Sequence, residues 1–450
     1  MKIIVCAKAS NGEINPFDAS AIECALQLSQ DVTVVSMGPP SCVEALKPLT
    51  RLGAKVILIS DSTFAGSDTL ATAYVLSVAL GQMKYDLILC GRQSVDGDTA
   101  QVGPMLSHKL GVPIIANAMK IECEEGIVFA NTRLGREYAA LPALVTVERS
   151  YVLRFPSIFS KVGEVQIVDN TTLCCDVSKC GLSGSPTRVL EAFQSESGKR
   201  KCRFIEKDEL LPLIERLKRE KPNEIHQPPT GQKLQSVWAV GEEILEKAKE
   251  IADEVILIEK ASPEIIAQRA MAEQPNAILW NADLWGRKNA PIVASMLETG
   301  LCADCTHLEA EGDTLIMYRP AQGGSIYAKI KCLTRPQMAT VRTKSESSDI
   351  IVSGGRGIAD HIEKLCDFAK KIGAEIGASR GLVDMNQMDY EKQIGLTGKT
   401  VSPKIYIAVG ISGAVQHTCA IEGADTVIAI NPDKNARIFD YADYGILDWF

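Results

Sequence analysis

Short apolar runs that alternate with helical periods are the feature of this sequence that most restricts its fold. The runs are rich in β-branched residues and are bounded by glycine or polar residues, a pattern typical of strands that are covered on both faces. They include residues 2–7, 32–37, 56–60, 86–90, 255–258, 277–280, 350–353, 405–409 and 426–430. Amphipathic stretches between them, such as 19–29 and 242–253, predict crossover helices. The expected fold class is therefore α/β with parallel sheets.

Length and composition further restrict the number of domains, the binding partners and the location of the protein. A chain of 450 residues suggests roughly three domains. The net charge of −8 provides no basic field for nucleic acid or an anionic membrane. No apolar run is long enough to cross a bilayer, so we expect a soluble protein that is not membrane-embedded. The start of the chain does not resemble a signal peptide, so its 14 cysteines predict reduced thiols and a cytoplasmic location.

The sequence predicts two related α/β domains and a third, unlike domain. An order of strand, polar loop, helix start, hairpins, proline and strand occurs at 85–147 and again at 276–341. A polar, proline-containing stretch between the two copies reads as an inter-domain arm and linker, although it contains a helical period at 207–220. The predicted boundaries are 1–194 for the first domain, 195–232 for the arm and linker, 233–344 for the second domain and 345–450 for the third.

Four strand ends in the last hundred residues carry the densest functional signal. Small or glycine-rich segments follow predicted strands at 352–357, 378–381 and 410–417, and Asn431 and Asp433 follow a fourth. Such turns place backbone N–H groups where a pyrophosphate is stabilised, at the strand ends where ligands of open α/β sheets bind. Packing alone also produces glycine-rich turns. A nucleotide-type cofactor accounts for all four turns together, whereas packing must account for each separately.

His417 lies within the turn 410–417 and has two interpretations. A single histidine is most often a structural residue whose ring nitrogens are satisfied internally. Beside a flavin, however, a histidine or arginine stabilises negative charge on the reduced ring and so tunes its potential. The sequence leaves both interpretations open.

The motifs resemble those of one family. Segments 335–342, 395–399, 406–417 and 430–433 are similar to the FAD-binding half of the electron transfer flavoprotein alpha subunit. Segments 15–18, 96–104, 141–147 and 184–187 are similar to the beta subunit. The resemblance covers nearly the whole chain and implies a beta–alpha fusion, with a Rossmann-like FAD-binding domain at the C-terminal end.

The resemblance implies two sets of cofactor-binding residues. The set for FAD comprises Arg356, Ser379, Arg380, Gly395, Leu396, Thr397, Ser412, Gly413, Ala414, Val415, Gln416, His417, Asn431 and Asp433. The set for AMP or a second FAD comprises Ala7, Asn15, Phe17, Asp18, Met37, Asp96, Asp98, Thr99, Gln101, Val102 and Gly103. No residue is assigned as catalytic, because the redox chemistry would belong to the flavin.

Three functions remain open at this stage. The resemblance implies an electron carrier that accepts electrons from flavin-dependent dehydrogenases on FAD and passes them to an acceptor. An electron-bifurcating form would use NADH and a second FAD. A protein of another class would bind or hydrolyse adenine nucleotides without a flavin. Cys302 and Cys305 have metal-like spacing, but a structural zinc site requires a second pair, so no metal is expected. Hydrolase motifs are absent from the sequence.

Overall fold

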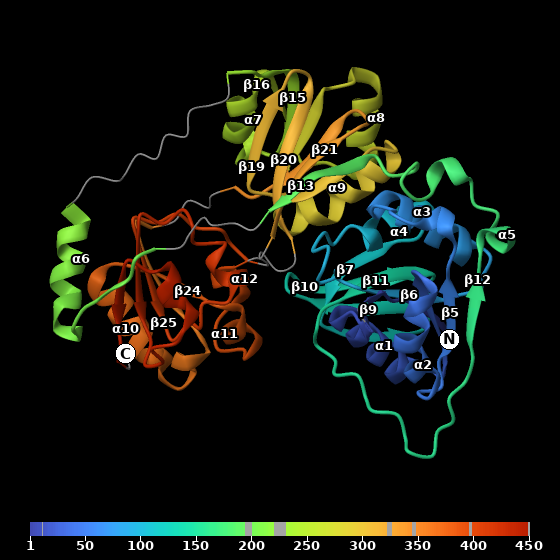
Figure 1. Ribbon diagram of the computed structural model, residues 1–450, viewed down its shortest axis with the longest axis horizontal. Helices are drawn as coiled ribbons and strands as arrows, with labels where there is room; N and C mark the ends of the chain where they lie inside the picture. Colours follow the sequence, from blue (N-terminus) through green and yellow to red (C-terminus); the bar gives the residue numbers. More distant parts are fainter. Residues whose placement is uncertain are drawn as a thin grey trace. The chain divides into compact units, whose positions relative to one another are not determined.

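The computed structural model describes residues 1–10, 12–193, 200–219, 231–321, 326–343, 348–395 and 398–448. The chain forms two compact units, which Figure 1 shows in the colours of the sequence. The first unit comprises Met1–Glu191, Pro229–Arg319 and Ala328–Val341, and the second comprises Ala192–Pro228, Pro320–Tyr327 and Arg342–Phe450. Within the described part of the chain, no helix is long and apolar enough to cross a membrane.

The first α/β domain contains a parallel seven-stranded sheet with the order β12-β5-β4-β1-β6-β11-β7. Its strands are β1 (Lys2–Cys6), β4 (Asp31–Met37), β5 (Lys55–Ile59), β6 (Leu87–Gly91), β7 (Ile114–Ala118), β11 (Ala143–Val147) and β12 (Val165–Val168). Its helices are α1 (Pro16–Leu28), α2 (Val43–Thr50), α3 (Thr69–Gly81), α4 (Val102–Leu110) and the short α5 (Asn170–Leu173). Ile3 and Val5 pack in one core cluster and Ile4 in another, because helices cover both faces of the sheet. Burial on both faces explains the uninterrupted apolar run in β1.

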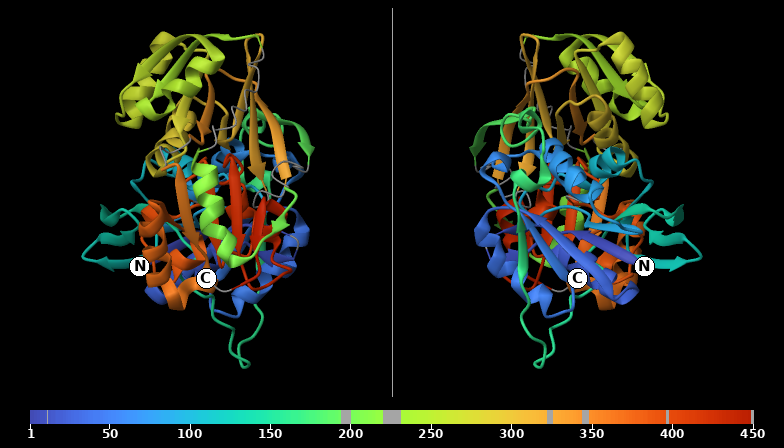
Figure 2. Two further views of the ribbon diagram at one scale, coloured as in Figure 1. Left: turned by 90° about the vertical axis from the view of Figure 1, so that its left-hand side faces the viewer. Right: turned by 90° about the vertical axis from the view of Figure 1, so that its right-hand side faces the viewer.

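Antiparallel hairpins extend this domain. A three-stranded sheet with the order β10-β9-β8 lies between β7 and β11 in the chain. Its strands are β8 (Lys120–Glu124), β9 (Ile127–Thr132) and β10 (Gly135–Ala140), and a small hairpin near the start pairs β2 (Ala9–Ser10) with β3 (Glu13–Ile14). The connection from β11 to β12 is a long loop, which Figures 1 and 2 show extending from the sheet.

The second α/β domain has a parallel five-stranded sheet with the order β16-β15-β17-β22-β18. Its strands are β15 (Leu234–Val240), β16 (Ala252–Ile258), β17 (Ala277–Asn281), β18 (Leu301–Cys305) and β22 (Gln337–Val341), and its helices are α7 (Leu245–Ile251), α8 (Pro263–Glu273) and α9 (Leu284–Met296). The helix predicted over 242–253 ends at Ile251, because Ala252 already begins β16. A four-stranded sheet joins β13 (Thr187–Phe193), β21 (Ile326–Cys332), β20 (Thr314–Ala321) and β19 (His307–Glu311).

The two domains repeat one local construction. β7 and β18 each pair with the strand that follows the hairpins, and each pairing contains a register shift. At this point Asn117 and Asp304 both have positive φ, 62° and 56°. The Asn117 N–H donates to Thr146 Oγ1 at 2.8 Å, and the Asp304 N–H donates to Thr340 Oγ1, also at 2.8 Å. The repeat predicted from the sequence is therefore present in the structure.

The C-terminal domain contains a parallel six-stranded sheet with the order β14-β27-β26-β25-β23-β24. Its strands are β14 (Arg203–Phe204), β23 (Ile350–Gly354), β24 (Glu375–Ala378), β25 (Ile405–Val409), β26 (Thr426–Ile430) and β27 (Tyr444–Ile446). Its helices are α6 (Leu210–Arg219), α10 (Ile362–Ile372), α11 (Arg380–Asp384) and α12 (Val415–Thr418). The fold class is therefore α/β throughout, as the sequence predicts.

Residues 200–219 of the predicted linker belong to the C-terminal domain. Residues 203–204 form the edge strand β14, and α6 lies against the strands of the same sheet (Figures 1 and 2). Leu213, Ile214 and Leu217 of α6 are buried in the core that contains Val352 of β23. An amphipathic helix gains more free energy by burying its apolar stripe than by spanning solvent between domains. Residues 195–199 and 220–230 of the predicted linker lie outside the described residues.

Candidate functional site

Four neighbouring strands of the C-terminal sheet end at one edge. Numbered along the chain, the strands from β24 to β27 have the order 2-1-3-4-5, so the strand order reverses between β23 and β25. Gly355 follows β23, Ser379 follows β24, Gly410 follows β25 and Asn431 follows β26. A reversal of strand order opens a crevice at the carboxyl ends of the strands, and nucleotide cofactors of doubly wound sheets bind in such crevices. The four predicted strand-end segments are thus brought together.

Glycines bring the two turns at the reversal into contact. A Cβ atom on Gly355 would lie 2.2 Å from the carbonyl oxygen of Gly410, and Gly410 itself has φ +62°. Gly413 has φ +83°, and a Cβ there would lie 2.0 Å from the backbone nitrogen of Ile438. The Ile438 N–H donates to the carbonyl of Ser412 at 3.2 Å, which holds this turn against the segment before β27. Only glycine allows this approach, so the path of the turn depends on residues without a side chain.

The turn after β25 leaves its other side chains accessible. Ser412, Ala414 and Gln416 are exposed, and Val415 is partly buried. A hydroxyl and an amide side chain therefore stand at the crevice with the backbone of a glycine-containing turn. Such a surface binds anionic groups through N–H donors and small polar side chains.

Two arginines stand at the same edge. Arg356 is exposed at the start of the helical turn after β23, and Gly381 leaves room for it, since a Cβ on Gly381 would lie 2.7 Å from Arg356 Cγ. Arg380 begins α11, and its Nε lies 3.1 Å from Asp384 Oδ2. The Ser379 N–H donates to the carbonyl of Gly354 at 2.8 Å, which ties the two strand ends together. The edge therefore carries two cations and a network of glycine turns, a combination that fits a phosphate-containing cofactor.

His417 points into the protein interior. Its ring is buried, Nδ1 lies 3.0 Å from the carbonyl oxygen of Ile394, and Nε2 lies 2.8 Å from the hydroxyl of Tyr406. Burial lowers the pKa of His417 to about 4, so the ring is neutral near pH 7. Of the two interpretations of this residue, the satisfied structural one describes its side chain in this structure.

The remaining predicted FAD residues differ in their surroundings. The side chain of Asn431 is buried, where its Nδ2 donates to the carbonyl of Ile411 at 2.9 Å and its Oδ1 accepts from the Asp433 N–H at 2.9 Å. Gly395 has φ +146° and packs against the backbone of Gln416. Asn431 and Gly395 therefore shape the turns of the crevice. Leu396 and Thr397 lie outside the described residues.

A second strand-end site occupies the first unit. The order of its sheet reverses around β1, which pairs with β4 on one side and β6 on the other. Asp18 is buried at this edge, and its carboxylate accepts from the N–H of Lys8 at 2.7 Å and of Gly91 at 2.9 Å. Burial raises the pKa of Asp18 to about 6, although both hydrogen bonds oppose that shift. The buried Asn15 donates to the carbonyl of Gln93 at 2.8 Å. These side chains hold together the loops that follow β1 and β6.

The loop after β6 is organised by internal bonds. Asp96 Oδ2 lies 2.6 Å from Lys8 Nζ, and Asp98 has φ 51°. Arg319 donates to the carbonyls of Gly97 at 2.8 Å and Asp98 at 3.1 Å. Gln101 accepts from Thr69 Oγ1 and donates to the carbonyl of Leu301. The remaining predicted residues share this edge: Ala7, Phe17 and Gly103 are buried, and Met37, Thr99 and Val102 are partly buried.

Sequence reasoning missed Lys8, Arg319 and Tyr406, which hold predicted site residues in place. Tyr406 had a usable signal, because a tyrosine within an uninterrupted apolar strand requires a buried partner for its hydroxyl. Arg319 comes from a distant strand, and no local pattern indicates its contact with the loop after β6.

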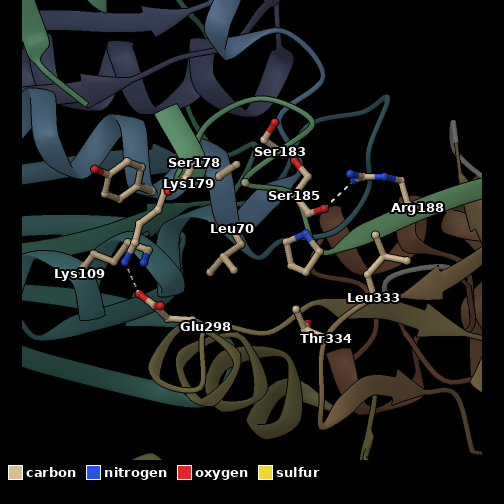
Figure 3. A pocket seen from close by; sticks show the side chains of 14 residues that line it. Leu70, Lys109, Ser178, Lys179, Ser183, Ser185, Arg188, Glu298, Leu333 and Thr334 are labelled. Carbon is tan, nitrogen blue, oxygen red and sulfur yellow. Dashed lines mark hydrogen bonds and ion pairs between the residues drawn. The ribbon is translucent and has the colours of Figure 1, made fainter. Parts of the chain in front are cut away.

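A cavity of about 250 Å³ elsewhere in the first unit does not contain any predicted cofactor residue. It is lined by α3, α4, the segment 178–188 and residues near β18 and β21 (Figure 3). Lys179 pairs with Glu298 at 2.8 Å, and Arg188 donates to the carbonyl of Ser185. Lys109 also lines this cavity, so three basic side chains and one carboxylate surround it. Among the described residues, no group of three or more His, Cys, Asp or Glu side chains is arranged to hold a metal ion.

Two reversals of strand order, one of them lined by glycine turns and arginines, give the fold the geometry of doubly wound sheets at which nucleotide-type cofactors bind. The model of the electron transfer flavoprotein domain matches residues 3–171 and again 236–349, and the model of the electron transfer flavoprotein FAD-binding domain matches residues 345–422. The chain belongs to the electron transfer flavoprotein family. The double match of one model agrees with the repeated construction of the first two domains.

Curated relatives match part of the chain. The electron transfer flavoprotein subunit alpha of Thermoanaerobacterium thermosaccharolyticum is 39% identical over 40% of this chain and 69% of its own length. Protein FixB of Azotobacter vinelandii is 40% identical over 39% of this chain and 62% of its own length. The acryloyl-CoA reductase electron transfer subunit beta of Anaerotignum propionicum is 33% identical over 48% of this chain and 83% of its own length. These relatives support a role in electron transfer.

Proposed function

We propose that this chain is an electron carrier that accepts electrons on a bound FAD from flavin-dependent dehydrogenases and passes them to a separate acceptor. The observation that carries the proposal is the glycine-lined reversal between β23 and β25, with Arg356 and Arg380 at its edge. FAD, when bound, supplies the electron-accepting and electron-donating chemistry. The protein binds the cofactor, orients it and sets the charge around it.

In the C-terminal domain, different residues bind the cofactor, orient it and set the charge around it. The turn 412–416 binds the diphosphate through its N–H groups and the Ser412 hydroxyl. Arg356, Ser379 and Arg380 contact the cofactor from the ends of β23 and β24, and Arg380 lies near the flavin ring. Gly395 lines the ring, and Asn431 and Asp433 stand on the adenosine side. Leu396 and Thr397, which the resemblance to the family adds to the ring site, lie outside the described residues. The ring of His417 is buried and neutral, so in this proposal the arginines supply the positive charge near the flavin.

We propose that the first domain holds a second adenine nucleotide and that the chain is a beta–alpha fusion acting in the cytoplasm. The site lies at the carboxyl ends of β1, β4 and β6, around the loop that begins after Gly91. If the nucleotide in the first domain is AMP, the chain has one FAD and acts as an electron carrier that does not bifurcate. A second FAD makes it a bifurcating protein that oxidises NADH, and this is the second candidate function.

Release and chromatography of the bound nucleotides, counted per chain, tests these assignments. We expect one FAD and one AMP from protein purified without added nucleotide. Two FAD per chain would replace the simple carrier by the bifurcating form. A colourless protein that also fails to take up added FAD would reject the proposal in favour of a nucleotide-binding protein without flavin.

Removing the charge of Arg380 is expected to weaken the flavin site. For R380A we expect the midpoint potential of the bound flavin to fall by about 20–40 mV for a two-electron couple, equivalent to ~1–2 kcal/mol, or FAD to be lost. The reason is that a cation near the ring stabilises the reduced anion. R269A is the matched control, because Arg269 also pairs with a carboxylate four residues later, at 2.6 Å, but on α8. A potential and FAD occupancy equal to those of R269A would reject the role of Arg380.

A further inference from the structure

A buried chain of hydrogen bonds joins β25 to two turns of the proposed flavin crevice. Tyr406 lies in the middle of the sheet with no exposed surface, and its hydroxyl lies 2.8 Å from Nε2 of His417. On the other side of the imidazole, Nδ1 lies 3.0 Å from the carbonyl oxygen of Ile394. A carbonyl only accepts hydrogen bonds, so Nδ1 must carry the proton. In the neutral ring Nε2 is then an acceptor, and the Tyr406 hydroxyl donates to it.

The imidazole therefore connects segments that are far apart in the sequence. The Ile394 N–H donates to the carbonyl of Ala378 at 2.8 Å, at the end of β24. The next residue, Gly395, donates from its N–H to the carbonyl of Lys399 at 3.2 Å. A Cβ on Gly395 would lie only 2.9 Å from the carbonyl oxygen of Gln416, so the two turns already touch at this point. His417 belongs to one turn and bonds the other.

We propose that Tyr406 is a positioning residue which, through the Nδ1–H tautomer of His417, holds the backbone at Ile394 and Gly395 against the turn Ser412–Gln416. Tyr406 and the ring of His417 act by fixing the distance between two walls of the crevice. Removing the Tyr406 hydroxyl leaves a buried acceptor without a donor and frees the ring to move. The effect on cofactor binding rests on the function proposed above, whereas the bonding of the ring does not.

The test compares Y406F with Y444F. Tyr444 is a second tyrosine of the same sheet, in β27, and its hydroxyl bonds Arg216 at 3.3 Å rather than His417. The full-length protein is labelled with ¹⁵N, and the imidazole nitrogens of its five histidines are recorded by NMR. Amide hydrogen exchange at Gly395 and Lys399 and the rate of FAD release are then measured in the wild type and both variants.

We expect His417 of the wild type to be protonated at Nδ1 and not at Nε2. In Y406F the imidazole nitrogen signals of His417 should shift and broaden because the ring loses its hydrogen bond at Nε2 and gains freedom to move. The amides of Gly395 and Lys399 should exchange roughly tenfold faster, and FAD should leave roughly tenfold faster. Y444F should match the wild type in all three measurements.

Two results would overturn the inference. One is a wild-type His417 protonated at Nε2, which decides the matter even if Y406F does not fold. The other is a folded Y406F whose exchange and FAD release equal those of Y444F. A wild type that holds no FAD but shows the Nδ1–H tautomer would contradict the proposed function, while exchange at Gly395 and Lys399 would still decide the role of Tyr406.

Discussion

Replacing Glu148 with alanine is expected to destabilise the first domain by about 3–5 kcal/mol. Glu148 follows β11, and its Oε1 lies 2.8 Å from Arg92 and 3.9 Å from Nε of Arg133. At most 8% of any of these three side chains is exposed. Removing the carboxylate would take from two buried guanidinium groups the anion that lies beside both. The loss of a partner from a buried ion pair is far more costly than the loss of an exposed one.

Hydrogen exchange followed by mass spectrometry on peptides from β6 and β11 measures this loss in a chain whose domains need not unfold together. E44A is the control, because Glu44 pairs with Lys47 at 2.6 Å while remaining 77% exposed. Its removal should cost less than about 0.5 kcal/mol. Since Arg92 begins the loop at the proposed second nucleotide site, we expect E148A also to release the nucleotide that we propose to bind there. Equal opening free energies for E148A and E44A would contradict the prediction.

Replacing Gly413 with alanine is expected to cost the C-terminal domain about 3 kcal/mol or more and to abolish FAD binding. The φ of +83° is unfavourable for alanine, and the added Cβ would meet the backbone nitrogen of Ile438 at 2.0 Å. Backbone cannot move aside as a flexible side chain does, so the turn after β25 must shift away from the segment before β27. That shift would move Ser412 and its neighbours, which line the crevice.

The control for G413A separates backbone strain from the steric clash. Gly373 ends α10 with φ +68°, and nothing lies within 4 Å of a Cβ built there. G373A should therefore cost only about 1 kcal/mol and leave FAD bound. Denaturant unfolding followed by flavin fluorescence and by far-ultraviolet circular dichroism compares the two variants. Similar losses in both would show that the contact between the turns does not hold the crevice.

Much of the fold could be predicted because burial on two faces leaves a local signature. The strand predicted over 405–409 matches β25, and the strand predicted over 426–430 matches β26. Central strands of a parallel sheet are apolar on both faces. Each one therefore appears in the sequence as a continuous run of apolar residues, and the run marks where the strand begins and ends. The repeated domains were predictable for the same reason, since their order of strands, hairpins and proline is a property of the chain.

Other features depend on contacts between residues distant in sequence. The stretch around 207–220 has a helical period, but only its packing on β23 shows that it belongs to the C-terminal domain. Motif position also failed to indicate that the ring of His417 faces inward, because the direction of its side chain depends on Tyr406 and Ile394. The same holds for Asp18, whose carboxylate accepts from the N–H groups of Lys8, after β1, and Gly91, at the end of β6.

By itself, the sequence determined the α/β class, the internal repeat and the glycine-rich segments after the C-terminal strands, because each is set by the order of neighbouring residues. The tertiary structure decided the order of the strands, and hence that the turns after β23 and β25 meet at a crevice. It also decided which polar side chains face that crevice and which are used internally. Those outcomes depend on hydrogen bonds and steric contacts that form only when separate segments pack together, and no local pattern encodes them.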